Sequence, residues 1–200
     1  QLLPVIVVLG ALSSFSFNSN SSSASIEETT TPLTTKLRSK ALELKYYATQ
    51  NGYNTDYCFL ADLGIASGKN RFFVYNFEDD REEQAGLVTH GMGLNPYTKN
   101  IVFSNETGSL CSSLGKYRIG NAYTGKYGPA YRLHGLDASN NNAFKRCVVL
   151  HGYDCVPDDE VYPAQICKSE GCPMVSPAFF ETLQSYIDES EKPVLMMIYN

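Results

Sequence analysis

The feature that most constrains the fold is a succession of short aromatic and β-branched runs separated by turn-forming residues. Such runs are typical of β-strands, and clusters such as Asp79-Asp80 and Gly128-Pro129 mark turns between them. The runs are Arg71–Phe77, Ala85–His90, Tyr117–Asn121, Ala130–Leu133, Arg146–His151 and Val194–Tyr199. No helix-length crossovers separate them, which disfavours a parallel α/β fold. We therefore predict a mostly antiparallel β domain.

Two helices are expected to flank this domain. The first covers Pro32 to Gln50 and ends at Asn51-Gly52, a typical stop signal. Its apolar residues recur at steps of three and four: Leu33, Leu37, Ala41, Leu44 and Ala48. The second begins at Ser176, a capping residue, with Pro177 in its first turn. One face of that helix carries Phe179, Phe180, Leu183, Tyr186 and Ile187.

The first 25 residues have the character of a targeting segment. Leu2 to Leu12 form an uncharged apolar run of 11 residues, whereas a membrane-spanning helix needs roughly 20. Serine-rich sequence follows up to Ser25. We expect residues 1–25 to be a truncated signal peptide and a flexible linker, with an uncleaved membrane tether as the alternative. Either reading predicts an exported protein of the periplasm or cell envelope, where disulfides are permitted.

Charge and cysteine content narrow the function classes. The chain has 16 Lys and Arg against 21 Asp and Glu, a net charge of −5, which argues against nucleic-acid binding. The composition does not decide whether the six cysteines form disulfides, bind a metal or act as nucleophiles. They are Cys58, Cys111, Cys147, Cys155, Cys167 and Cys172.

One segment suits a thiol nucleophile. Gly171 directly before Cys172 allows a sharp turn, and Pro173 after it stiffens the backbone. A thiol needs a base, and His151 ends an apolar run upstream. This pair alone is a weak pattern. A zinc site formed by His151, Cys155, Cys167 and Cys172 is a less favoured alternative, because these spacings fit no compact zinc motif.

The string from His151 to Cys172 resembles the signature of the YkuD-type L,D-transpeptidases. In that signature a histidine is followed, after roughly 14–17 residues, by Ser/Thr-x-Gly-Cys; here 17 residues separate His151 from Ser169-Glu170-Gly171-Cys172. Further segments resemble a branch described as murein L,D-transpeptidase catalytic domains: Thr89–Gly93, Phe103–Asn105, Ser112–Gly115, Tyr123–Lys126, Arg132–Leu136 and Val148–Gly152. The resemblance covers residues 55–200, after a leading helix region at 26–54.

The resemblance implies an antiparallel β-sandwich or barrel that acts on peptidoglycan stem peptides. Cys172 would be the nucleophile, His151 its base, and the Gly152 carbonyl the group that orients the histidine. Backbone amides near Gly171 would stabilise the oxyanion, and Ser169 would shape the turn. The implied reaction joins a tetrapeptide donor to an amine acceptor, needs no metal or other cofactor, and is expected of a monomer.

The sequence also departs from that family. Glu170 stands where many members have histidine, and Met174 stands where many have a basic or amide residue. Substrate binding is therefore assigned to other candidates: Arg132 (with Arg146 as a substitute), His90, Ser112 and Ser113. Two alternatives stay open, namely hydrolysis of the same bond type by an L,D-carboxypeptidase or endopeptidase, and a catalytically weak wall-binding module.

A free Cys172 leaves five cysteines, which cannot all pair within one chain. Cys155 and Cys167 are the most plausible disulfide, since both lie between the candidate base and nucleophile. Cys147 is predicted to point inward from a strand as a small buried hydrophobic residue.

Overall fold

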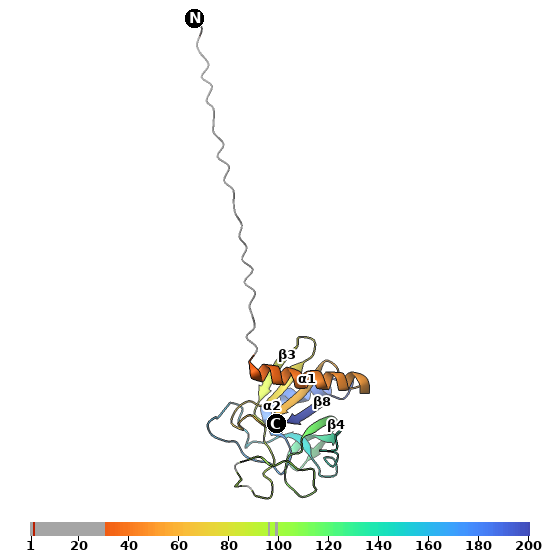
Figure 1. The fold of residues 1–200 in the computed structure, drawn as a ribbon, viewed down its shortest axis with the longest axis vertical. Coiled ribbons are helices and arrows are strands. Elements are labelled where there is room, and N and C mark those ends of the chain that lie inside the picture. Colours follow the sequence, from red (N-terminus) through yellow and green to blue (C-terminus); the bar gives the residue numbers. More distant parts are fainter. Residues whose placement is uncertain (1, 3–30, 96, 99) are drawn as a thin grey trace. The chain divides into compact units, whose positions relative to one another are not determined.

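The fold is described by a computed structural model that places residue 2 and residues 31–95, 97–98 and 100–200 (Figure 1). Thr31 to Asn200 form one compact unit. Apart from residue 2, the predicted targeting segment lies outside the described residues. Within the described ranges, none of the helices has the length and apolar character needed to cross a membrane.

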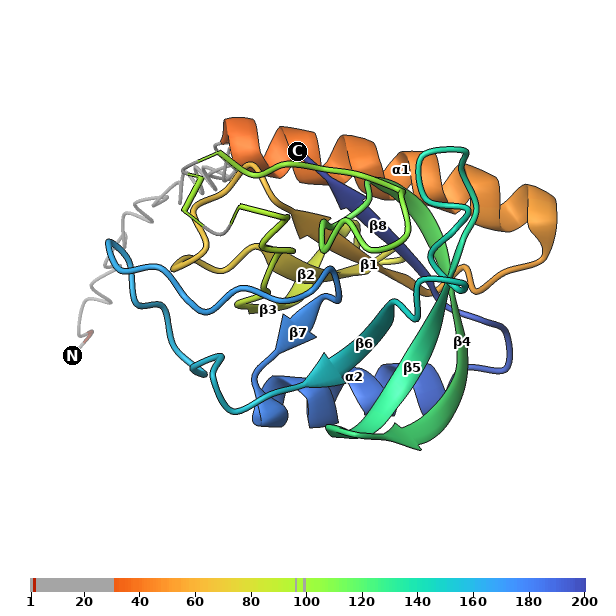
Figure 2. The same ribbon diagram turned by 90° about the horizontal axis from the view of Figure 1, so that it is seen from below.

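Eight strands form a single sheet in the order β3-β2-β1-β8-β4-β5-β6-β7 (Figure 2). They are β1 (Tyr57–Asp62), β2 (Phe72–Asn76), β3 (Arg81–Gly86), β4 (Gly115–Gly125), β5 (Gly128–Gly135), β6 (Val149–Gly152), β7 (Met174–Val175) and β8 (Leu195–Tyr199). The mostly β fold class with flanking helices is confirmed. Across the described strands the sheet is open, with β3 and β7 at its edges, rather than a closed barrel or a two-sheet sandwich.

Two strand pairings are parallel, which the run pattern did not predict. β8 pairs in parallel with β1 and antiparallel with β4, and β6 pairs in parallel with β7. The other pairings between these strands are antiparallel. Parallel neighbours need long connections, and here the connection between β1 and β8 includes most of the domain.

The structure differs from the predicted strands at four places. The run Ala85–His90 is not a strand along its length, because β3 ends at Gly86 and the following backbone bonds to other loops. The strands β1 and β7 were not predicted. Cys147 is exposed and sits in a turn with φ 58°, because β6 begins only at Val149; the prediction that it is buried on a strand is wrong.

The leading helix, α1 (Pro32–Asn51), forms as predicted. Thr31 caps it by accepting a hydrogen bond from the Thr34 N–H at 3.2 Å, and Gly52 ends it in the left-handed conformation with φ 72°. Leu37, Ala41, Leu44 and Ala48 of its apolar stripe pack on alternate residues of the central strands, such as Leu60 and Met197. Leu33, predicted on the same stripe, is exposed. The first helix therefore covers one face of the sheet.

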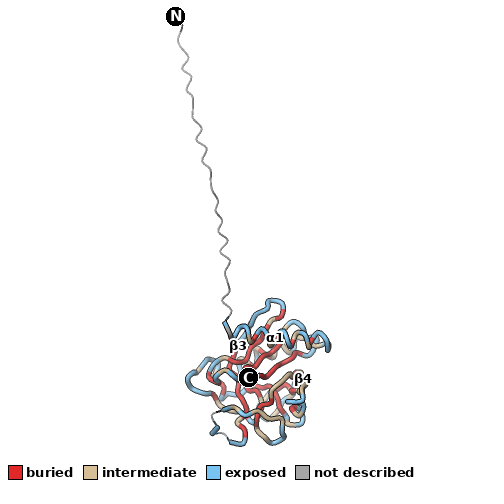
Figure 3. The backbone as a smooth tube through the Cα atoms, in the orientation of Figure 1, coloured by how far each residue is buried: buried red, intermediate tan, exposed pale blue. Residues whose placement is uncertain are grey.

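The second helix, α2 (Pro177–Asp188), covers the opposite face. Ser176 caps it and Pro177 lies in its first turn, as predicted. Phe180 and Leu183 are buried among the other set of alternate strand residues, including Phe59 and Met196. Because side chains alternate along a strand, the two helices give the sheet two cores, which Figure 3 shows as the buried centre of the unit.

Candidate active site

Cys172 lies at the end of a tightly turned loop, immediately before β7. Gly171 has φ +115°, and a Cβ there would lie 2.7 Å from the carbonyl oxygen of Cys111, so the position requires glycine. The Gly171 N–H donates to the Ser169 hydroxyl at 3.1 Å. The loop therefore has the sharp turn that the sequence predicted, and Ser169 braces it from within.

The Cys172 thiol is half-buried and lies 3.8 Å from the carbonyl oxygen of Cys147. Burial raises its pKa above the ordinary value, and the nearby charges of Cys147 and Glu170 raise it further. A backbone hydrogen bond from Val149 and the charge of Arg146 act in the opposite direction. Because the net effect disfavours the thiolate, this cysteine needs a base to become nucleophilic.

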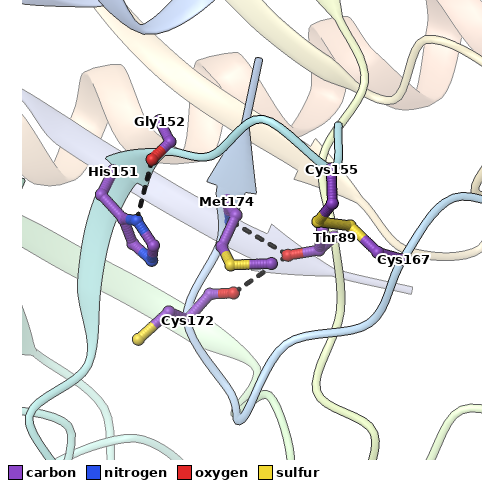
Figure 4. The surroundings of a disulfide bond; sticks show 7 residues. All are labelled: Thr89, His151, Gly152, Cys155, Cys167, Cys172 and Met174. Atoms are coloured by element: carbon purple, nitrogen blue, oxygen red, sulfur yellow. Dashed lines mark hydrogen bonds between the residues drawn. A yellow bond between two sulfur atoms is a disulfide. The ribbon is translucent and has the colours of Figure 1, made fainter. Parts of the chain in front are cut away.

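His151, the candidate base, lines the same cavity as Cys172. It lies on β6, where it is the register partner of Met174 on β7, so the parallel pairing brings it close to the nucleophile loop. Its Nδ1 lies 3.1 Å from the Gly152 carbonyl oxygen. A carbonyl only accepts, so Nδ1 carries the proton and Nε2 keeps a lone pair. Figure 4 shows the ring and the Cys172 side chain on neighbouring elements.

The charge state of His151 suits proton acceptance. Burial lowers its pKa below the ordinary value, while the hydrogen bond to Gly152 raises it. The net direction is downward, so the imidazole is neutral at neutral pH. A neutral ring with a fixed tautomer is the form that can accept a proton from a thiol.

Two tyrosines that the sequence analysis missed form an aromatic wall beside His151. Tyr127, at the tip of the hairpin between β4 and β5, stacks on the His151 ring with centroids 5.6 Å apart and an interplanar angle of 16°. Tyr153 meets Tyr127 edge-on at 5.2 Å. Tyr127 directly follows Tyr123–Lys126, one of the segments that resemble the family. A tyrosine at the tip of a turn has no sequence pattern that marks it as a site residue.

These groups surround a cavity of about 230 Å³. Its lining residues are Met92, Tyr127, His151, Tyr153, Cys155, Lys168, Ser169, Glu170, Cys172 and Met174. A neighbouring cavity of about 390 Å³ shares Tyr127 and Tyr153 and includes Gly152. The structure thus brings together Cys172, His151, Gly152, Gly171 and Ser169.

The four predicted substrate-binding residues lie outside the walls of that cavity. His90 is buried and accepts a hydrogen bond from the Arg71 guanidinium at 3.0 Å, and burial, together with the charge of Arg71, lowers its pKa to about 4. Ser112 accepts from the Gly91 N–H, and Ser113 bonds to Tyr117. These contacts hold loops together.

Of the two candidate arginines, only one lies beside the loop that carries Cys172. The guanidinium of Arg132 lies over the rings of Tyr123 and Phe144. Arg146 instead donates to the carbonyl oxygens of Ser104 and Cys111, beside the Gly171 turn. Of the two, Arg146 is therefore the one whose charge acts on Cys172.

The predicted disulfide between Cys155 and Cys167 is present, with Cα atoms 6.1 Å apart. Both thiols are thereby removed from the four-ligand zinc alternative, which needs them as thiolates. In the part of the chain that the structure describes, no group of three or more His, Cys, Asp or Glu side chains is placed to hold a metal ion. The bridge instead borders the cavity, where Cys155 is one of the lining residues.

A family profile described as L,D-transpeptidase catalytic domain matches residues 29–199. No curated protein sequence matches the chain.

Several solved structures are similar at low identity. The helical cell shape determining protein Pgp2 from Campylobacter jejuni is 16% identical with a TM-score of 0.46, over 71% of this chain and 46% of Pgp2. An L,D-transpeptidase from Xylanimonas cellulosilytica is 16% identical with a TM-score of 0.40, over 77% and 68%. One from Mycobacterium tuberculosis is 13% identical with a TM-score of 0.41, over 72% and 58%.

The chain spans about half the length of Pgp2. The family profile, in contrast, covers nearly all residues from the leading helix to the last strand. The protein therefore belongs to the L,D-transpeptidase catalytic domain family.

Proposed function

We propose that this protein is a peptidoglycan L,D-transpeptidase in which Cys172 is the nucleophile and His151 the base. The observation that carries the proposal is the His151 ring, fixed by the Gly152 carbonyl with its Nε2 lone pair available, in one cavity with a half-buried thiol. Family membership supports the substrate class, which is the stem tetrapeptide of the cell wall.

The first half-reaction forms an acyl-enzyme. Nε2 of His151 takes the proton of the Cys172 thiol, and the sulfur attacks the carbonyl carbon at the L-centre of the third stem residue. Backbone N–H groups of the Gly171–Cys172 turn stabilise the oxyanion of the tetrahedral intermediate. The C–N bond then breaks, the leaving D-Ala amine takes the proton from the imidazolium, and a thioester remains.

The second half-reaction transfers the acyl group. An amine of a neighbouring stem attacks the thioester, His151 accepts a proton from it, and the thiol is regenerated as a 3→3 cross-link forms. If water is the acceptor, the product is a tripeptide and the enzyme is an L,D-carboxypeptidase. The two outcomes share every residue named above and differ only in the acceptor.

We also propose that the protein is exported to the periplasm or cell envelope and acts there as a monomer. The apolar run from Leu2 to Leu12 supports export. The Cys155–Cys167 disulfide supports it independently, because such bonds persist in oxidising compartments.

The test incubates the purified protein with a disaccharide tetrapeptide and identifies the products by mass spectrometry. Cross-linked dimer supports transpeptidation, and tripeptide alone supports hydrolysis. Retained binding without turnover would support the wall-binding alternative. Cys172→Ala is expected to abolish turnover, whereas the matched control Cys147→Ala removes the neighbouring exposed thiol and should leave turnover intact. Full activity in Cys172→Ala contradicts the proposed mechanism.

A covalent probe tests the acylation step alone. An L,D-transpeptidase has been solved in complex with the carbapenem imipenem, and we expect imipenem to add its mass to this protein at Cys172. His151→Ala should abolish that addition. Unchanged acylation in the variant would remove His151 from the mechanism.

A further inference from the structure

Pro173 creates a local gap in the backbone hydrogen bonding next to the nucleophile. Proline has no N–H, so the residue between Cys172 and Met174 donates nothing to a neighbouring strand. Cys172 precedes β7, which is only two residues long and forms one edge of the sheet. The nucleophile therefore sits where the sheet itself supplies little restraint.

A single buried side chain fills that gap. Thr89 is 1% exposed, and its hydroxyl donates to the Cys172 carbonyl oxygen at 3.2 Å and accepts from the Met174 N–H at 3.0 Å. Figure 4 shows both bonds, with Thr89 facing the backbone on either side of Pro173. The Thr89 N–H also donates to the Met174 carbonyl at 2.9 Å.

The residues that follow Thr89 hold the other side of the same loop. The Ser169 N–H donates to the His90 carbonyl at 2.9 Å, and the Met92 N–H donates to the Ser169 carbonyl at 2.8 Å. One segment, Thr89 to Met92, thus anchors the nucleophile loop before and after Cys172. Most of these bonds use backbone groups, which any residue could supply; the Thr89 hydroxyl is the exception.

From this geometry we propose that Thr89 is a positioning residue for Cys172. Its hydroxyl fixes the Cys172 carbonyl, and with it the orientation of the adjoining peptide groups and of the thiol toward the substrate carbonyl. Its side chain does not line the cavity that Cys172 and His151 share, and its hydroxyl bonds only backbone groups. The role rests on the proposed function of Cys172, and it assigns a task to the Thr-His-Gly segment that the catalytic residues leave unexplained.

The experiment compares two reactions of Cys172 in three variants of the full chain. Acylation by imipenem requires an oriented thiolate and oxyanion donors, whereas alkylation by iodoacetamide requires the thiolate but no oxyanion donors. Thr89→Val keeps the shape and removes both hydroxyl bonds, and Thr89→Ser restores the hydroxyl. Thr31→Val makes the same chemical change at the cap of α1, on a different element, as the control for lost stability.

We expect Thr89→Val to lower the acylation rate by about 10- to 100-fold, because small misplacements in an active site have effects of this size. Its alkylation rate should stay close to that of wild type, because alkylation uses no oxyanion donors. Thr89→Ser should recover most of the acylation rate, and Thr31→Val should keep it.

Three results would overturn the inference. The first is an acylation rate in Thr89→Val equal to that of wild type, and the second is no recovery of that rate in Thr89→Ser. The third is a loss of alkylation in Thr89→Val as large as its loss of acylation, which would indicate a structural role alone. If wild-type protein itself shows no acylation, the proposed function fails and this role falls with it, so the two failures are distinguishable.

Discussion

At the scale of single residues, the protonation of His151 sets the pH range of the proposed reaction. The pKa of His151 is lowered by burial and that of Cys172 is raised by burial. In the proposed mechanism the pair therefore starts as neutral imidazole and neutral thiol, and the proton moves during attack. This arrangement differs from a preformed ion pair, in which the thiolate exists before substrate binds.

The pH dependence of acylation tests this protonation state of His151 and Cys172. The rate of imipenem acylation should fall on the acid side only below the ordinary histidine pKa of about 6.5, because a lowered pKa keeps His151 neutral further into acid. His151→Gln should lower the rate by about 10² to 10⁴ and move the remaining reactivity to alkaline pH, where the thiol ionises unaided. A wild-type acylation rate that already falls above pH 6.5 would contradict the assignment of His151 as the base. His134→Gln is the control variant and should keep the wild-type pH profile.

Gly171 allows a second prediction at this scale. Gly171→Ala places a Cβ 2.7 Å from the Cys111 carbonyl oxygen at φ +115°. We expect a loss of about 1–3 kcal/mol in unfolding free energy and a loss of acylation, measured by urea titration and mass spectrometry. Gly108→Ala is the matched control, because Gly108 also has positive φ but no atom lies within 4 Å of its added Cβ. Equal behaviour of the two variants would contradict the close-approach argument.

At the scale of elements, the β4–β5 hairpin joins the active site through its tip. Tyr127 stacks on His151 and contacts Tyr153, so the hairpin limits the ring's movement and solvent access. Tyr127→Ala should lower turnover more than Tyr127→Phe, which keeps the stacked ring. Steady-state kinetics on the tetrapeptide measure this, and equal losses in both variants would indicate that the hydroxyl is the important group instead.

The loop closed by Cys155 and Cys167 carries another element-scale prediction. The bridge spans 12 positions, and closing a loop of that length stabilises a fold by about 3 kcal/mol in the chain-entropy account. The double variant Cys155→Ser/Cys167→Ser should lose stability of this order, as measured by chemical unfolding. Adding a reductant to the wild type should reproduce the loss and should have no further effect on the variant.

The helices and strands differ in how far they can be predicted from the sequence. Both helices were predictable because capping residues and apolar periodicity are local signals, as at Thr31 or at Ser176 and Pro177. The strand β1 was missed because Tyr57–Asp62 contains no β-branched residue and ends on Ala and Asp, which are depleted in strands. Cys147 was misplaced because the strand starts two residues later, and strand starts depend on pairing with distant partners. The Cys172–His151 pair was recognisable through the resemblance of its segment to the family signature, whereas Tyr127 and Thr89 join the site only through tertiary packing.

At the scale of the whole molecule, the three histidines couple stability to pH. All three have pKa values lowered first by burial, and that of His90 is lowered to about 4. A histidine with a depressed folded-state pKa contributes stability that is complete above its unfolded pKa of about 6.5 and is lost as the pH falls below that value. The protein should therefore lose stability between about pH 6.5 and pH 4.

Unfolding by urea at pH 7 and at pH 4.5 measures this loss. We expect His90 alone to account for on the order of 2 kcal/mol, after allowance for its partial solvation. His90→Asn keeps an acceptor toward Arg71 but does not titrate in this range, so its stability should change less with pH. A variant as pH-sensitive as the wild type would show that other groups dominate.

The position of β8 has a consequence for the order in which the unit folds. This last strand lies between β1 and β4, all five of its residues are buried, and it contributes to both cores. Before β8 pairs with both β1 and β4, the two halves of the sheet have no strand to join them. The two halves therefore cannot be completed one after the other along the chain, and pairing between segments so far apart in sequence is expected to make folding slow.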